Sequence, residues 1–161
     1  MEIVRSSIIG GIAATAVLTA LLLVSDSLIG GTSPFVFATF MSLCAIGGPP
    51  YCEPSSLMAT AMTFLSFLAL FALAWPLLFG AFTWGLPGES GLTHGAVFGL
   101  VLYAGYVGTV LYGIGIGGET VAENLPLLAV MVFAYLAYGL VLGGVYDRLA
   151  AHRTFLSPNP D

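Results

Sequence analysis

Four long apolar runs dominate this sequence and limit the folds that the chain can adopt. A helix needs about 20 apolar residues to cross the hydrocarbon core of a bilayer. Charged residues make up 7% of the chain, whereas about a quarter is usual for a soluble domain, so too little polar surface is present to face water. The lipid bilayer is therefore the predicted solvent and main partner of the chain, and the predicted spans are Ile8–Leu28, Leu57–Trp84, Gly95–Tyr112 and Leu125–Tyr146.

These runs predict helices and not strands. No water bonds the backbone inside lipid, so only helices and closed barrels cross it. The runs are continuously apolar, whereas barrel strands alternate. We therefore predict an all-α polytopic membrane protein with four transmembrane helices. Residues 1–150 form its single domain, and residues 151–161 form a disordered cytoplasmic tail.

The last apolar run repeats the pattern of the second. Small and apolar residues align at matching positions: Ala74 with Ala137, Leu77 with Leu140, Gly80 with Gly143 and Leu86 with Leu149. The repeat predicts a bundle built as two helical hairpins. Pro76 is expected to kink the second span, because its ring removes a hydrogen bond to the preceding turn.

The segment between the first and second spans is apolar in its middle. Phe35–Ile46 is too short to cross a bilayer, so it predicts a short non-spanning helix that is either interfacial or re-entrant. Cys44 and Cys52 are the two cysteines of the chain. On the predicted outer side they form either a disulfide or two unpaired buried thiols. Two cysteines without a nearby histidine make a poor metal site, and we predict no metal and no cofactor.

The distribution of charge predicts the orientation. The basic residues are Arg5, Arg148 and Arg153, and they flank the first and last spans. The positive-inside rule then places both termini in the cytoplasm, in a multi-pass protein of the plasma membrane. A cleaved signal peptide is the less favoured interpretation of the first run. The net charge of -5 argues against a nucleic-acid partner, and an acidic chain without lysine hints at a halophilic archaeal host.

Small residues recur at the spacing that brings helices close together. In lipid, helices associate by close contact, and GxxxG-type stripes allow two backbones to approach. The predicted helix-packing residues are Gly10, Gly11, Gly91, Gly95, Gly99, Gly139 and Gly143.

Few polar residues fall at membrane depth, and each has a structural explanation beside a functional one. Asp26 is either an acid at headgroup level or a functional carboxylate. Glu89 and His94 are either a proton-relay pair or solvated interface residues. Tyrosine hydroxyls either bond across the seam between the third and fourth spans or line a polar path; the residues are Tyr103, Tyr106, Tyr135 and Tyr138. No enzyme motif is present, so no catalytic residue is predicted.

Several short motifs resemble one known pattern. The second span ends in W-G-L-P-G, the third begins H-G-x-x-x-G, and the fourth ends in G-x-x-Y-D-R-L. The chain resembles an uncharacterised family, a domain of unknown function, of small four-span membrane proteins from archaea and bacteria. The resemblance implies the fold and a membrane location, and it lends no activity and no functional residue.

Three functions are consistent with these observations. The first is a non-catalytic packing or accessory subunit, or a homo-oligomeric one, which the close-packing glycines favour. The second is a small transporter or channel built from the two-hairpin repeat. A membrane enzyme ranks last, because few acid–base groups share one depth. A partner is therefore expected to be a second copy or another membrane subunit.

Overall fold

The computed structural model describes residues 2–28, 57–86, 90–111 and 125–150, and all of these except Leu86 and Ser90 are helical. Four helices are long and apolar enough to cross a membrane: Ile3–Leu28, Thr60–Phe82, Gly91–Gly108 and Leu127–Ala150. The predicted all-α fold with four candidate spans is therefore confirmed. The elements are α1 (Glu2–Leu28), α3 (Leu57–Ala69), the π-helical turn η2 (Leu70–Ala74), α4 (Trp75–Phe82), the 3₁₀ turn η3 (Thr83–Gly85), α5 (Gly91–Leu111) and α6 (Leu125–Ala150).

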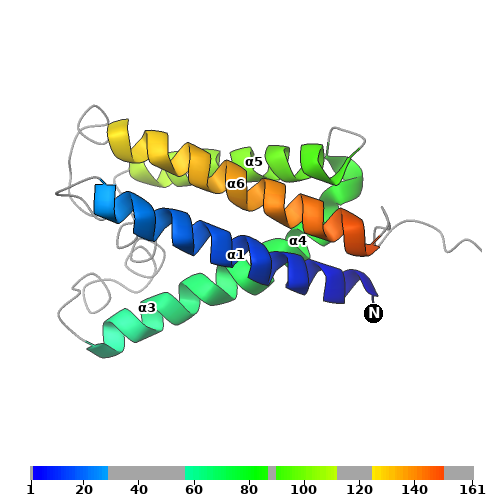
Figure 1. Ribbon diagram of the computed structural model, residues 1–161, viewed down its shortest axis with the longest axis horizontal. Coiled ribbons are helices and arrows are strands. Elements are labelled where there is room, and N and C mark those ends of the chain that lie inside the picture. The colour runs from blue at the N-terminus through cyan, green and yellow to red at the C-terminus, as the bar shows by residue number, and fades with distance from the viewer. Residues whose placement is uncertain (1, 29–56, 87–89, 112–124, 151–161) are drawn as a thin grey trace, which may run out of the picture.

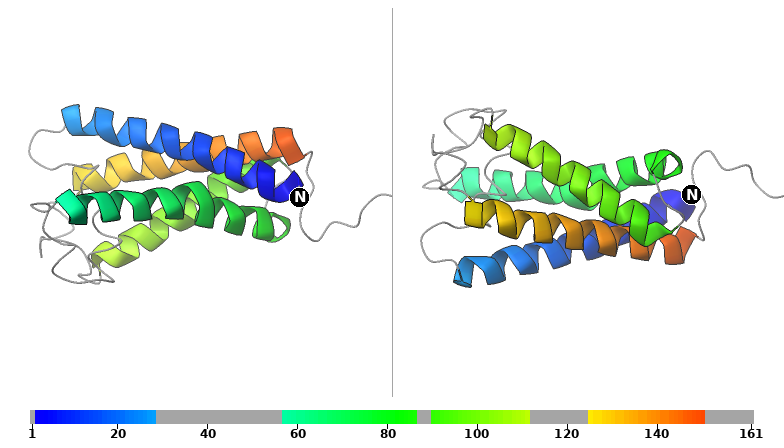
Figure 2. Two further views of the ribbon diagram at one scale, coloured as in Figure 1. Left: turned by 90° about the horizontal axis from the view of Figure 1, so that it is seen from below. Right: turned by 90° about the horizontal axis from the view of Figure 1, so that it is seen from above.

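The helices lie side by side and alternate in direction (Figures 1 and 2). The first residue of α1 and the last residue of α6 lie at the same end of the bundle, as an even number of spans requires. α6 is central, because it packs against α5 on one side and against α1 on another. α1 also contacts η2 and α4.

The second span consists of α3, η2 and α4, and its two halves are held differently. α4 packs against α1, whereas the contacts of α3 among the described elements are mainly with η2, the next turn of the same helix. In Figure 1 α3 diverges from α1 as it runs away from η2. The side chains of Leu57 and Met58, at the start of α3, are 88% and 77% exposed.

The core is a continuous cluster of apolar and aromatic side chains. Helical periodicity places Ala14, Leu18 and Leu22 on one buried face of α1. α6 contributes Met131, Tyr138 and further residues at spacings of three or four, and Phe67, Phe71 and Phe79 of the second span complete the cluster. Apolar side chains are also exposed on the outside of every span, which suits contact with lipid.

Some predicted features lie outside the described residues. These are the short helix at 35–46, Cys44 and Cys52 with their disulfide, and the tail at 151–161. The disulfide and the two-hairpin arrangement stay predictions.

Candidate functional site

The second span is interrupted at mid-length, where Pro76 follows a single π turn. The Trp75 N–H donates to the Leu70 carbonyl oxygen, one residue further back than in an α-helix. The Phe71 carbonyl oxygen therefore loses its α-helical donor. The next residue, Pro76, cannot replace that donor, because proline has no N–H. The sequence predicted a kink at Pro76, and the structure shows the local backbone change that accompanies this proline.

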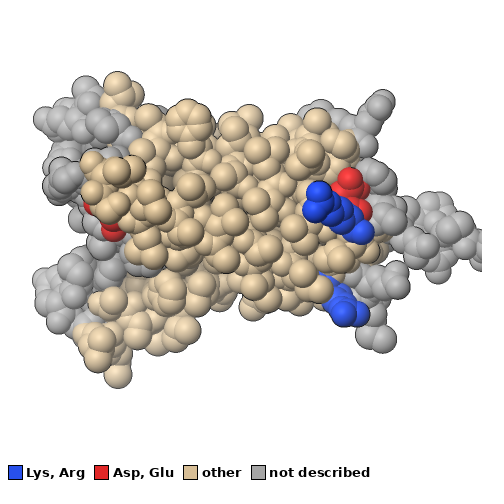
Figure 3. Space-filling model, viewed as in Figure 1, with Lys and Arg blue, Asp and Glu red and all other residues tan. Residues whose placement is uncertain are grey.

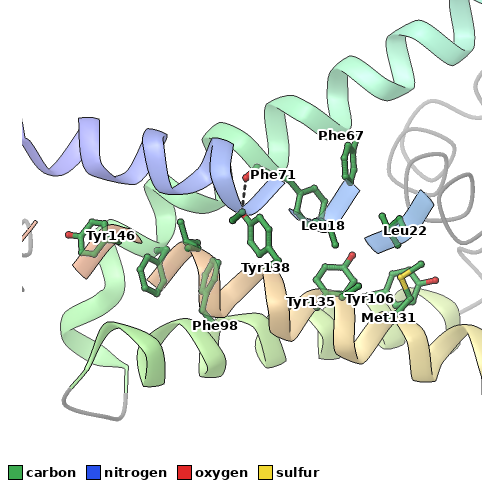
Figure 4. Packing of buried hydrophobic residues seen from close by; sticks show 14 of the residues in the cluster. Leu18, Leu22, Phe67, Phe71, Phe98, Tyr106, Met131, Tyr135, Tyr138 and Tyr146 are labelled. Carbon is green, nitrogen blue, oxygen red and sulfur yellow. Dashed lines mark hydrogen bonds between the residues drawn. The ribbon is translucent and has the colours of Figure 1, made fainter. Parts of the chain in front are cut away.

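A side chain from the last span supplies the missing donor. The Tyr138 hydroxyl of α6 donates to the Phe71 carbonyl oxygen at 2.6 Å, and Tyr138 is fully buried (Figure 4). The two aromatic rings also meet edge to face, with centroids 5.4 Å apart. An unsatisfied carbonyl in hydrocarbon costs several kcal/mol, so this hydrogen bond stabilises the break in the second span.

α1 covers the other side of the break at Gly11. A Cβ atom at Gly11 would collide with the Pro76 ring and would lie 2.5 Å from the Ala72 carbonyl oxygen. Only glycine therefore lets α1 approach this closely. Ser7 and Thr15 lie one helical turn to either side, and their buried hydroxyls have no hydrogen-bond partner among the described residues.

Close contacts on the C-terminal side of the break hold α4, the second half of the span. A Cβ atom at Gly80 would collide with the Ser7 Oγ atom of α1. The Phe79 ring packs against Phe98 and Tyr146, with centroid distances of 5.3 and 5.5 Å. Three helices therefore hold α4 in place.

The predicted packing glycines lie at helix contacts. On the α5–α6 seam, a Cβ atom at Gly91, Gly95 or Gly99 would collide with backbone carbonyl oxygens of α6. The same holds in reverse for Gly139 and Gly143 against α5. Gly10 faces Leu142, where a Cβ atom would lie 3.2 Å from its Cδ1 atom.

The mid-span tyrosines make different contacts. The rings of Tyr106 and Tyr135 pack across the α5–α6 seam with centroids 5.8 Å apart, and the Tyr135 ring also lies 5.9 Å from the Phe71 ring. Tyr138 points away from that seam and toward the second span. Tyr103 is partly buried beside the core. Of the four hydroxyls, the structure therefore shows that of Tyr138 bonded to a backbone carbonyl of the second span.

The other polar candidates lie at the ends of the bundle. Asp26 is in the last turn of α1, and its neighbours Ser25 and Ser27 donate to the backbone oxygens of Leu21 and Val24. His94 is in the first turn of α5, and its N–H donates to the Ser90 carbonyl oxygen at 3.0 Å. Glu89 lies outside the described residues. Within the part of the chain that the structure describes, no three His, Cys, Asp or Glu residues gather as a metal site.

Charged side chains also lie at the ends of the bundle. On the face shown in Figure 3, the Lys, Arg, Asp and Glu side chains lie at the two ends of the bundle and the middle is uncharged. Arg5 and Arg148 belong to the end where the described chain begins and finishes. Among the described residues, the mid-span polar groups include hydroxyls, the Trp75 indole and backbone groups.

Sequence reasoning missed two of these contacts. For the Tyr138–Phe71 hydrogen bond, the sequence pointed only to Pro76, because proline removes a backbone donor. Nothing in the sequence singled out Tyr138. The Gly80–Ser7 contact had a signal in the repeat, which aligns Gly80 with the close-packing Gly143.

Comparison with known protein families gives a match along almost the whole chain. A sequence model described as "Family of unknown function (DUF6789)" matches residues 1–157. No curated protein and no solved structure matches the chain.

Proposed function

Because the chain belongs to the Family of unknown function (DUF6789), as its resemblance to an uncharacterised family predicted, and because that family lends no activity, we propose a function from the geometry. The protein is a non-catalytic membrane protein that acts by packing against another membrane helix. The partner to which we commit is a second copy of this chain.

One observation carries this proposal: the described bundle closes its own interior and leaves a face of small residues outside. The interior is filled by aromatic rings and by glycines in backbone contact with α6. The charged groups lie at the ends on the face shown in Figure 3. The geometry therefore favours a protein that works through its outer surface.

That surface is the outer face of α5, formed by Val101, Ala104, Gly105 and Gly108. Val101, Ala104 and Gly105 are exposed. A Cβ atom at Gly105 or Gly108 would meet nothing within 4 Å among the described residues. Ala104 and Gly108 have the four-residue spacing that lets helices approach closely. A two-fold pair would bring the same residues together from both copies, as closed dimers do.

Cysteine crosslinking tests the proposal in native membranes. In a C44S/C52S background, Ala104→Cys is expected to give a disulfide-linked dimer on mild oxidation. Phe133→Cys is the control, because Phe133 is 71% exposed on α6 and lies off the α5 face. Gly108→Leu is expected to abolish the A104C dimer. A protein that stays monomeric contradicts the proposal, and a crosslink to a different chain replaces the second copy by an accessory partner.

We also propose that both termini are cytoplasmic, in the plasma membrane. The support is that Arg5 and Arg148 belong to one end of the bundle, and basic residues favour the cytoplasmic side. A C-terminal green fluorescent protein fusion should fluoresce, while a C-terminal alkaline phosphatase fusion should be inactive. The opposite result would reverse the orientation.

The break in the second span favours one alternative, a small transporter. Transporters often bind their solutes where a spanning helix is interrupted, because free backbone carbonyls lie there. Here the Phe71 carbonyl is already bonded to Tyr138, which is why we rank this function second. If reconstituted vesicles take up a solute or an ion and Tyr138→Phe abolishes that flux, the transporter becomes the favoured function.

A further inference from the structure

The break in the second span offers the Phe71 carbonyl two alternative donors. In the observed π register, Trp75 N–H bonds to Leu70 and the Tyr138 hydroxyl bonds to Phe71. In a continuous α register, Trp75 N–H would itself bond to Phe71. We propose that η2 is a two-state hinge, and that the Tyr138 hydroxyl holds it in the π register.

The two registers differ by one residue in the helix, which defines the motion. One residue corresponds to a rotation of about 100° and a rise of about 1.5 Å. A change of register therefore turns one half of the second span about its own axis relative to the other half.

The half that turns is α3, because α4 is fixed. α4 is held by Gly11 and Ser7 of α1 and by the rings around Phe79. Among the described elements, α3 has few contacts beyond η2, which continues the same helix, and its first residues are exposed. The π turn therefore joins α4, which contacts three helices, to α3, which has fewer contacts among the described elements.

Packing just before the hinge keeps the second register in the minority. Phe67 and Thr63 of α3 are buried in the observed register, and the Phe67 ring lies 4.8 Å from that of Phe71. A rotation of α3 removes them from these positions. The Tyr138 hydrogen bond adds to this preference, and its removal shifts the balance without loss of ring volume.

Distance measurements by electron spin resonance in lipid nanodiscs test the hinge with the full chain. In a C44S/C52S background, one pair of spin labels at Met58→Cys and Leu125→Cys joins α3 to α6. A second pair at Ile12→Cys and Leu100→Cys stays within the body, and all four positions are exposed. Tyr138→Phe should raise a second Met58–Leu125 distance component about fivefold, the effect of one lost hydrogen bond. The Ile12–Leu100 distance should not change.

Tyr135→Phe is the matched control, because the Tyr135 ring also packs against Phe71 and this variant removes a hydroxyl without removing the hydrogen bond to the Phe71 carbonyl. It should leave both distances unchanged. No change in Tyr138→Phe, or an equal change in both variants, overturns the proposal.

Pro76→Ala separates the hydrogen bond from simple packing. This substitution restores a backbone N–H at position 76, which reaches the Phe71 carbonyl in the π register, so the Tyr138 hydroxyl would no longer be needed. Tyr138→Phe should therefore change the Met58–Leu125 distances in the parent and leave them unchanged in the P76A background. An equal effect in both backgrounds means that Tyr138 acts through packing, and the hinge proposal fails.

A second measurement reports the register directly. Trp75 and Trp84 are the two tryptophans of the chain, so ¹⁵N-tryptophan labelling gives two backbone amide signals, which Trp84→Phe assigns. Tyr138→Phe should add a second Trp75 signal in the parent, whereas P76A/Y138F should show the same Trp75 signals as P76A. If Tyr138→Phe folds only in the P76A background, the Phe71 carbonyl needs a donor that no second register supplies, and the hinge proposal fails; if it folds in neither, Tyr138 has a purely structural role and the proposal is also wrong.

Discussion

The α5–α6 seam and the break in the second span solve the same problem in opposite ways. Both lie where backbone polar groups must be satisfied without water. At the seam each helix is regular, and glycines let the two backbones touch. At the break the helix is incomplete, and a side chain from α6 supplies the missing donor. The seam therefore requires glycines, which have no Cβ atom, whereas the break requires the hydroxyl of Tyr138.

The largest effect is expected at the seam, from Gly143→Ala. A Cβ atom there would collide with the backbone oxygen of Gly91, and backbone cannot rotate away as a side chain can. We expect the free energy of unfolding to fall by about 3 kcal/mol, at the upper end for overpacking. Unfolding in mixed micelles of mild detergent and SDS, followed by circular dichroism, measures it.

Gly85→Ala is the control for that experiment, because Gly85 lies outside both the seam and the proposed dimer face. Its Cβ atom would enter open space among the described residues, so the change should stay within about 0.5 kcal/mol. Equal losses in the two variants would show that the seam is not the tight contact described above.

Gly80→Ala sharpens the comparison, because Gly80 aligns with Gly143 in the repeat but meets a side chain. Its added Cβ atom would collide with the Ser7 Oγ atom, and we expect a loss of about 1.5 kcal/mol. Ser7→Ala removes that oxygen, and the remaining Ser7 Cβ atom lies 3.6 Å away. The double variant S7A/G80A should therefore recover most of the loss in the same unfolding assay. Strictly additive losses would contradict this contact.

Tyr138→Phe tests the break. It keeps the ring and removes one buried hydrogen bond, so the free energy of unfolding should fall by about 1 kcal/mol. Tyr135→Phe should cost less, because the Tyr135 hydroxyl makes no hydrogen bond to the described residues. A larger loss at Tyr135 would move the important hydroxyl from the break to the seam.

The smallest effect is expected from Thr15→Val, beside the break. Thr15 is 3% exposed and its hydroxyl has no partner among the described residues. Valine keeps the shape and removes the unpaired polar atom, so stability should rise by about 0.5 kcal/mol. A loss of stability would reveal a partner for that hydroxyl.

The seam could be predicted from the sequence because its determinants are local. Gly91, Gly95 and Gly99 recur every four residues, and that spacing alone puts them on one face of a helix. Long apolar runs likewise fix the spans, since length and hydropathy decide whether a helix can cross lipid.

The break could be predicted only in part. Pro76 removes a donor wherever it stands in a helix, so a kink could be predicted. Which group completes the backbone depends on the rotation of α6 relative to the second span, and no local pattern encodes that rotation. For the same reason the sequence put Tyr138 among four equivalent tyrosines, whereas the structure gives it a separate contact.

The separation of Phe71 and Tyr138 along the chain has a consequence for biogenesis. The two residues are 67 positions apart, so the ribosome finishes the second span well before it translates Tyr138. During insertion the Phe71 carbonyl has no partner from α6, and the nascent protein reaches its final hydrogen-bonded form only when the last helix leaves the translocon.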